Sequence, residues 1–127
     1  MLIVNNDLSA VERNWLEVML SNDFLYRTEL IEQINHAEIV REYTKYYLSL
    51  KFKVSRAVSA TGCNTRIPVE MRIYKSGCVP IQFLLHIVDG YISELEIFSA
   101  DSSEIKQNLE IGNSRKEFVF DESVKVI

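Results

Sequence analysis

The stretch VPIQFLLHIVDGYISELEIFS, residues Val79–Ser99, decides the fold. Two apolar runs of strand length flank Asp89 and Gly90 within it. An Asp-Gly pair between alternating hydrophobic residues is the strongest short-range signal for a β-hairpin, because a type I′ turn requires positive φ at both central residues. The sequence therefore predicts two long antiparallel strands, Pro80–Val88 and Tyr91–Phe98.

A two-residue turn also predicts the register of this hairpin, with Leu85 opposite Glu94 and Phe83 opposite Glu96. Because side chains alternate between the two faces of a strand, one face is expected to hold six apolar residues and two glutamates. These are Ile81, Phe83, Leu85, Ile87, Ile92 and Phe98, with Glu94 and Glu96 among them. Two carboxylates in such surroundings are the feature of the hairpin that most needs an explanation.

The residues before the hairpin predict a helix pair followed by strands. Ser9 and Glu12 have the spacing of a capping box, so a first helix is expected from there to about Leu20, and a second from about Arg27 to His36. Half-buried strands are predicted at Glu38–Tyr43, Tyr46–Val54 and Ile67–Tyr74, with residues 118–120 packed on the sheet edge. Helices followed by strands indicate a single α+β domain over residues 1–127, an antiparallel helix pair on a meandering antiparallel sheet of about five strands.

Composition and charge narrow the possible functions. The chain has 127 residues, of which 47% are hydrophobic and 25% charged, as is ordinary for one globular domain. Its net charge of −4 disfavours nucleic acid as a partner, because Lys and Arg drive phosphate binding, but it permits a basic protein partner. No P-loop, Rossmann glycine pattern or HExxH motif occurs, so neither a cofactor nor a metal is expected.

Cysteine usage and hydropathy indicate a cytoplasmic protein. Cys63 and Cys78 do not form a CxxC pair, and they are expected to be free thiols in a reducing compartment. The N-terminus has no basic region typical of a signal peptide, and no apolar run approaches the ~20 residues that span a bilayer. A membrane partner is therefore not expected.

Glu94 and Glu96 are the best candidates for a functional site, since side chains at i and i+2 project from one sheet face roughly 7 Å apart. They either keep an exposed sheet soluble, with Lys or Arg of a neighbouring strand as partners, or they grip a basic protein from within an apolar patch. The binding hypothesis predicts an interface of Glu94, Glu96, Asp89, Asp101, Phe83 and Phe98. A glycosidase also uses two carboxylates, but so short a chain would struggle to build a sugar cleft.

A second polar patch is basic and aromatic. It consists of Lys45, Lys51, Lys53 and Arg56 with Tyr43, Tyr46 and Tyr47. Interleaved basic and aromatic residues can bind single-stranded nucleic acid, but the acidic net charge favours a solvated sheet face here.

The hairpin run LLHIVDGYISELEIF, residues Leu84–Phe98, is followed by Ala100 and Asp101. It resembles a widespread group of short uncharacterised bacterial proteins that have the form LLHVVDGYLSELEIY followed by an ADG-like turn. The resemblance covers about Leu8–Glu104 and includes the opening helical pattern around Ser9. Ser residues at 102 and 103 stand where the group most often has Gly, and the group brings no catalytic residues with it.

Small proteins of this kind are often encoded beside polymorphic or contact-dependent toxins, and they resemble the cognate immunity proteins. The resemblance implies a non-enzymatic protein, monomer or homodimer, that binds and neutralises a basic toxin domain, often a nuclease. Two alternatives stay open. One is a small-ligand-binding or regulatory domain that dimerises through a sheet edge, and the other is an enzyme that uses Glu94, Glu96 or His86.

Overall fold

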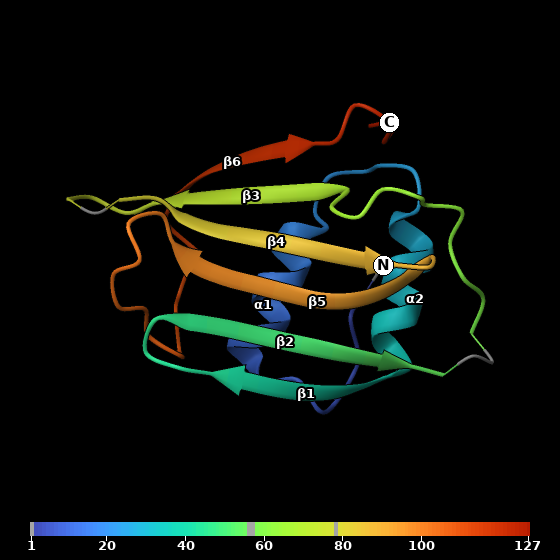
Figure 1. Cartoon of the computed structure of the whole chain (residues 1–127), viewed down its shortest axis with the longest axis horizontal. Helices are drawn as coiled ribbons and strands as arrows, with labels where there is room; N and C mark the ends of the chain where they lie inside the picture. The colour runs from blue at the N-terminus through green and yellow to red at the C-terminus, as the bar shows by residue number, and fades with distance from the viewer. Residues whose placement is uncertain (1, 56–57, 78) are drawn as a thin grey trace.

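The computed structural model of the chain describes residues 2–55, 58–77 and 79–127. Within them two helices precede six strands of one antiparallel sheet, which confirms the α+β class (Figure 1). The elements are α1 (Ala10–Met19), α2 (Arg27–Asn35), β1 (Ala37–Tyr43), β2 (Tyr47–Val54), β3 (Val69–Tyr74), β4 (Ile81–Val88), β5 (Tyr91–Ser99) and β6 (Arg115–Phe120).

The strands lie in the order β1-β2-β5-β4-β3-β6, with every neighbouring pair antiparallel. This order is not a simple meander, because β5 rather than β3 pairs with β2. The predicted hairpin, β4 and β5, occupies the centre of the sheet. A sixth strand, β6, includes residues 118–120, which were expected only to pack on the sheet edge.

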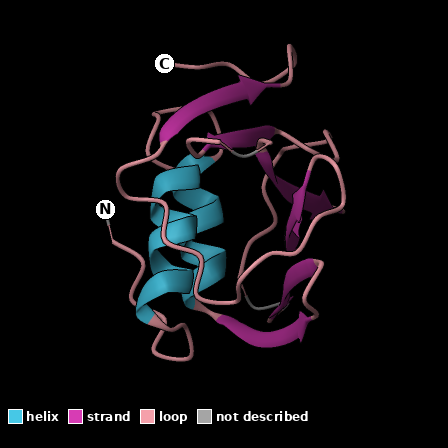
Figure 2. Ribbon diagram, turned by 90° about the vertical axis from the view of Figure 1, so that its left-hand side faces the viewer, coloured by secondary structure: helices cyan, strands magenta, loops and turns pink. Residues whose placement is uncertain are grey.

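The two helices run in opposite directions across one face of the sheet (Figures 1 and 2). The predicted capping box of α1 is confirmed: Ser9 Oγ accepts from Glu12 N at 3.2 Å, and Glu12 Oε1 accepts from Ser9 N at 2.8 Å. Trp15 of α1 has no exposed surface, and its indole N–H donates to Leu109 O at 2.7 Å. Trp15 therefore anchors the core between helix and sheet.

The hairpin turn has the predicted geometry, with φ of 53° at Asp89 and 80° at Gly90. Val88 faces Tyr91, as a two-residue turn requires. A Cβ atom on Gly90 would lie 2.7 Å from the backbone oxygen of Thr61, so glycine is needed for space as well as for its backbone conformation.

The register shifts after the second residue pair beyond this turn. Ile87 still faces Ile92, but His86 faces Glu94, and Leu85 therefore faces Leu95 rather than Glu94. Ser93 is the additional residue on β5, and one extra residue on one of two paired strands is a β-bulge. The predicted register is wrong by one residue from this point to the end of the hairpin.

Hydrogen bonds from outside the hairpin satisfy the backbone groups beside the bulge. Ile92 N donates to Gln33 Oε1 of α2 at 2.8 Å, and Ile87 N donates to Arg66 O at 2.7 Å. Both amides thus find partners away from the opposite strand. Gln33 Nε2 also donates to Gly90 O at 3.0 Å, so one buried glutamine of α2 holds both the turn and the bulge.

The bulge moves the later side chains of β5 to the opposite faces of the sheet, and it thereby removes the glutamates from the core. The buried side chains of the hairpin are Phe83, Leu85, Ile87, Ile92, Leu95 and Ile97, on the face that meets the helices. Glu94 and Glu96 instead lie on the opposite face, where Phe98 accompanies them. The predicted placement of the glutamates among the core residues is therefore wrong. One inserted residue moves every later side chain of the strand to the opposite face of the sheet.

Candidate functional site

The candidate site lies on the sheet face that the helices leave uncovered (Figure 2). We call this surface the outer face. The strand register assigns to its centre Tyr47, Ser49 and Lys51 of β2, Glu94, Glu96 and Phe98 of β5, and Gln82, Leu84 and His86 of β4.

Glu94 is held by two hydroxyl groups of the neighbouring strand. Its Oε2 accepts from Tyr47 at 2.7 Å and from Ser49 at 2.5 Å. Burial would raise the pKa of Glu94, but the hydrogen bonds from Ser49 and Tyr47 outweigh burial and hold the pKa below its usual value. Burial and the bond to Glu94 raise the pKa of the Tyr47 hydroxyl. Glu94 is thus an ionised carboxylate in a fixed position.

Glu96 is held through a second, separate chain of contacts. His86 Nε2 lies 2.9 Å from Glu96 Oε1, and Arg66 Nε donates to His86 Nδ1 at 3.3 Å. Because Nδ1 accepts a hydrogen bond in this arrangement, the ring proton is on Nε2 and is donated to Glu96. The imidazole therefore orients Glu96.

The two carboxylates form a preorganised acidic pair along β5. Glu94 uses Oε2 and Glu96 uses Oε1 for these bonds, and no hydrogen bond between described residues uses Glu94 Oε1 or Glu96 Oε2. Both side chains are half-buried, and half-buried Phe98 and Leu84 lie beside them. The arrangement offers two fixed acceptor oxygens in partly apolar surroundings.

Basic groups moderate the charge of the outer face. Lys51 lies directly opposite Glu94 in the β2–β5 register, but its Nζ is 2.9 Å from Glu42 Oε1 of β1. Lys53 is exposed on the same face. The outer face therefore carries both signs of charge, and the acidic pair is a local feature of its centre.

The predicted acidic loop residues do not join this pair. Asp89 is exposed in the β4–β5 turn, and Asp101 is exposed beyond the opposite end of β5. Asp101 Oδ1 accepts from Ser99 Oγ at 2.9 Å and from Ser103 N at 3.0 Å, and these bonds lower the pKa of Asp101. Asp101 thus orders its own turn.

The two predicted aromatic residues have different positions. Phe83 has no exposed surface and packs against Trp15 with ring centroids 6.5 Å apart, so its predicted place on the binding surface is wrong. The β-bulge is the reason, since it sends Phe83 and the glutamates to opposite faces. Phe98 does share the outer face with Glu94 and Glu96.

The contacts of the acidic pair were not predicted from the sequence. Alternation along β2 correctly placed Tyr47 and Ser49 on its polar face, but it could not show that this strand pairs with β5. The predicted alternation places His86 on the face opposite the glutamates, and Arg66 lies outside the predicted strands. A pattern search for hydroxyl and imidazole donors on polar strand faces would have found three of these four residues.

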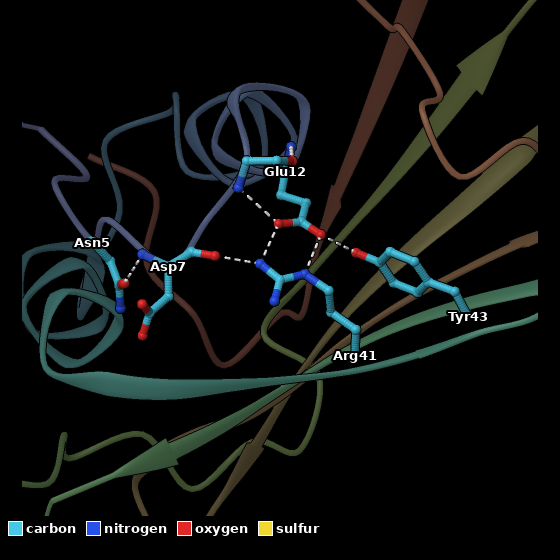
Figure 3. Close-up of polar contacts among 6 residues, drawn as sticks. Asn5, Asp7, Glu12, Arg41 and Tyr43 are labelled. Atoms are coloured by element: carbon cyan, nitrogen blue, oxygen red, sulfur yellow. Dashed lines mark hydrogen bonds and ion pairs between the residues drawn. The ribbon is translucent and has the colours of Figure 1, made fainter.

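A second polar cluster joins α1 to β1 and is structural (Figure 3). Glu12 accepts from Arg41 Nε and Nη2, both at 2.6 Å, and from the Tyr43 hydroxyl at 2.6 Å. Burial would raise the pKa of Glu12, but bonds from Arg41, Ser9 and Tyr43 lower it to about 2. Arg41 Nη2 also donates to Asp7 O. The Glu12 side chain is only 4% exposed, so the cluster fixes the helix on the sheet rather than meeting a ligand.

The remaining polar groups of the described ranges give no further site. Cys63 is a free, buried thiol whose pKa burial raises. The described residues contain no group of three or more His, Cys, Asp or Glu side chains that could hold a metal ion. No helix among them is long and apolar enough to cross a membrane. Cys78, and Arg56 of the basic patch, lie outside the described residues.

Comparisons with protein-family models, with curated proteins and with solved structures give no match to this chain.

Proposed function

We propose that this chain is a cytoplasmic, non-enzymatic binding protein that neutralises a cognate bacterial toxin domain, as an immunity protein does. The outer face, centred on Glu94 and Glu96, is the surface that contacts the toxin. The observation that carries the proposal is the acidic pair itself: two carboxylates held in place by hydrogen bonds, each with an oxygen that no described residue uses.

Preorganisation is what suits this pair to tight binding. A surface glutamate normally loses side-chain freedom when a partner orders it, and that loss weakens association. Tyr47, Ser49 and His86 have already fixed the two glutamates. A lysine or arginine of the partner can therefore bind with less entropic cost, and the acidic pair can also speed encounter with a basic surface.

The surroundings of the pair supply the apolar part of such an interface. Phe98 lies opposite Tyr47 in the β2–β5 register, and Leu84 lies opposite Glu96 in the β4–β5 register. Aromatic residues are frequent among the few side chains that dominate binding energy. We expect Tyr47 and Phe98 to be such anchors beside the acidic pair.

The test is to co-express the tagged chain with the product of the adjacent gene, purify the complex and measure its dissociation constant by isothermal titration calorimetry. Glu94→Gln with Glu96→Gln removes two charges but keeps the shape of both side chains. This double variant is expected to weaken binding by at least about tenfold, with the loss shrinking as salt rises.

The matched control is Glu38→Gln with Glu70→Gln. These residues lie on the outer face on β1 and β3, so the control removes the same charge from the same face away from its centre. It is expected to change the dissociation constant by less than about threefold. Two results would refute the role of the acidic pair: an equal loss of affinity in the two double variants, or unchanged binding when Glu94 and Glu96 are both replaced by Gln.

An open hollow at one end of the sheet favours a second candidate function, small-ligand binding. It has a volume of about 580 Å³, and it is lined by apolar side chains and by polar groups of both charges: Ile81, Ile105, Leu109, Lys75, Lys106, Glu104, Glu110 and Asn108. Ligand-observed NMR with metabolite mixtures tests this candidate. A ligand that shifts the amide signals of residues 104–110 would support it, and an absence of binders would count against it.

A further inference from the structure

We propose that β6 pairs in antiparallel fashion with β6 of a second copy of this chain, so that two copies form a two-fold dimer with one continuous sheet. This inference is independent of the proposed function, because it uses the sheet edge and leaves the outer face free. The proposal rests on the edge of β6. In one register, the charges and apolar groups of this edge are complementary to those of a second copy.

The edge in question is the free side of β6, the last strand of the sheet (Figure 1). An edge strand leaves every second N–H and C=O group without a ladder partner, and such a row is a template for pairing with another strand. The chain after β6 turns away, since Leu25 N donates to Lys125 O at 2.8 Å and Ile127 N to Asp23 O at 2.9 Å. Figure 1 accordingly shows the C-terminal tail beyond the end of β6 and not alongside it.

The hydrogen-bonding pattern between β3 and β6 identifies which backbone N–H and C=O groups of β6 point away from β3. Asp121 N donates to Pro68 O at 3.0 Å, and this bond continues the pairing of Val69 with Phe120 by one residue. Hydrogen-bonded and non-hydrogen-bonded pairs alternate in an antiparallel ladder. The residues whose N–H and C=O groups face away from β3 are therefore Lys116, Phe118 and Phe120.

Three positions of the two-fold axis, on Glu117, Phe118 and Val119, pair most of β6 with its copy, and only one of them avoids like charges. Centring the two-fold axis on Glu117 places this glutamate opposite its own copy. Centring the axis on Val119 places Glu117 opposite Asp121 of the second copy. Centring it on Phe118 places Arg115 opposite Asp121 of the second copy at both ends of the pair, which is an attractive contact.

The same register buries apolar surface on both sides of the new ladder. Val119 on the outer face is 40% exposed and becomes the neighbour of Glu117, which Arg72 already holds at 2.8 Å. Phe118, partly buried against the core, becomes the neighbour of Phe118 from the second copy. Aromatic cross-strand pairs of this kind stabilise antiparallel strands.

The other edge of the sheet is less open. Thr44 N donates to Tyr47 O at 2.8 Å, so the outward groups of β1 belong to Ala37, Ile39, Arg41 and Tyr43. Asn5 Nδ2 already donates to Ala37 O at 2.9 Å, and the N-terminal segment thereby covers the start of this edge. We therefore assign the pairing to β6, whose charges are complementary in the register centred on Phe118.

Two consequences follow from the geometry of a strand-to-strand dimer. A six-residue strand pair is smaller than the roughly 1,600 Å² of a standard interface, so we expect a weak dimer that forms at micromolar concentrations and above. A two-fold axis perpendicular to the sheet keeps the outer faces of both copies on the same side. The dimer would thus present two acidic pairs to its surroundings.

The first test is sedimentation equilibrium over a range from micromolar to submillimolar protein. The mass is expected to rise from 14.7 kDa toward twice that value. Lys116→Pro removes an outward N–H that the β3 ladder does not use, and by symmetry it removes two bonds from each dimer. We expect it to raise the dissociation constant by roughly tenfold or more, whereas Lys116→Ala, which loses the same side chain but keeps the N–H, changes it less than about threefold.

A charge exchange tests the register itself. Arg115→Asp and Asp121→Arg are each expected to weaken the dimer by about threefold to tenfold, and the double variant to restore it toward wild type. A monomer at every concentration overturns the proposal, as does a dimer that Lys116→Pro leaves unchanged. A mass that grows without limit would mean head-to-tail pairing of β1 with β6 and would overturn it as well.

Discussion

Replacing Glu12 by Gln should remove a stabilisation that depends on pH, and its size can be worked out from the structure. The bonds from Arg41, Ser9 and Tyr43 lower the pKa of Glu12 from the usual 4.5 to about 2 in the folded protein. Each pKa unit corresponds to about 1.4 kcal/mol, so the ionised carboxylate contributes about 3 kcal/mol to the free energy of unfolding at pH 7. Such a contribution is a large part of the stability of a small domain.

The sign of the pH dependence follows from a pKa that is lower in the folded state. The contribution is fully present above about pH 4.5, where the unfolded chain also ionises Glu12, and it is lost as the pH falls toward 2. The difference in free energy of unfolding between wild type and Glu12→Gln should therefore fall from about 3 kcal/mol at pH 7 to less than about 1 kcal/mol at pH 2.

Urea unfolding followed by the fluorescence of Trp15, which is buried beside α1, measures this difference at each pH. Glu17→Gln is the matched control, since Glu17 is exposed on the same helix, and it should change the free energy of unfolding by less than about 0.5 kcal/mol at pH 7. A difference between wild type and Glu12→Gln that stays constant from pH 7 to pH 2 would refute the reasoning.

Two further substitutions test what holds the central hairpin. Gln33→Leu leaves the buried N–H of Ile92 without a partner, and urea unfolding should show a loss of about 2–3 kcal/mol; a loss below about 0.5 kcal/mol would mean that Gln33 does not hold the bulge. Gly90→Ala brings a Cβ within 2.7 Å of Thr61 O at a φ of 80° and should cost more than about 2 kcal/mol. Gly112→Ala, with nothing within 4 Å, is its control and should cost far less.

The features that the sequence predicts correctly are those that neighbouring residues determine. Ser9 and Glu12 form their capping box within one helical turn. Asp89 and Gly90 can adopt positive φ because Asp has a short side chain and Gly has none. The alternation along β2 reports its two faces directly. Each of these signals is complete within about ten residues of sequence.

The features that the sequence does not predict depend on distant residues. The backbone beside the bulge at Ser93 is hydrogen-bonded to Gln33 of α2 and to Arg66, neither of which belongs to the hairpin. A register without the bulge places the glutamates on the wrong face of the sheet, so the hydrogen bonds of the acidic pair cannot be predicted. The sequence does not indicate β6 as a strand because its first three residues are charged, and only its pairing with β3 makes them a strand.

The bulge at Ser93 is also the feature on which the outer face and its acidic pair depend, and it can be measured on this protein alone. In the structure Leu85 faces Leu95 and Phe83 faces Ile97 as non-hydrogen-bonded pairs, whose Cα atoms approach most closely in an antiparallel ladder. A nuclear Overhauser spectrum of labelled protein should therefore link the Hα of Leu85 to that of Leu95. A link from Leu85 to Glu94 instead would return the glutamates to the core side and contradict the proposed site.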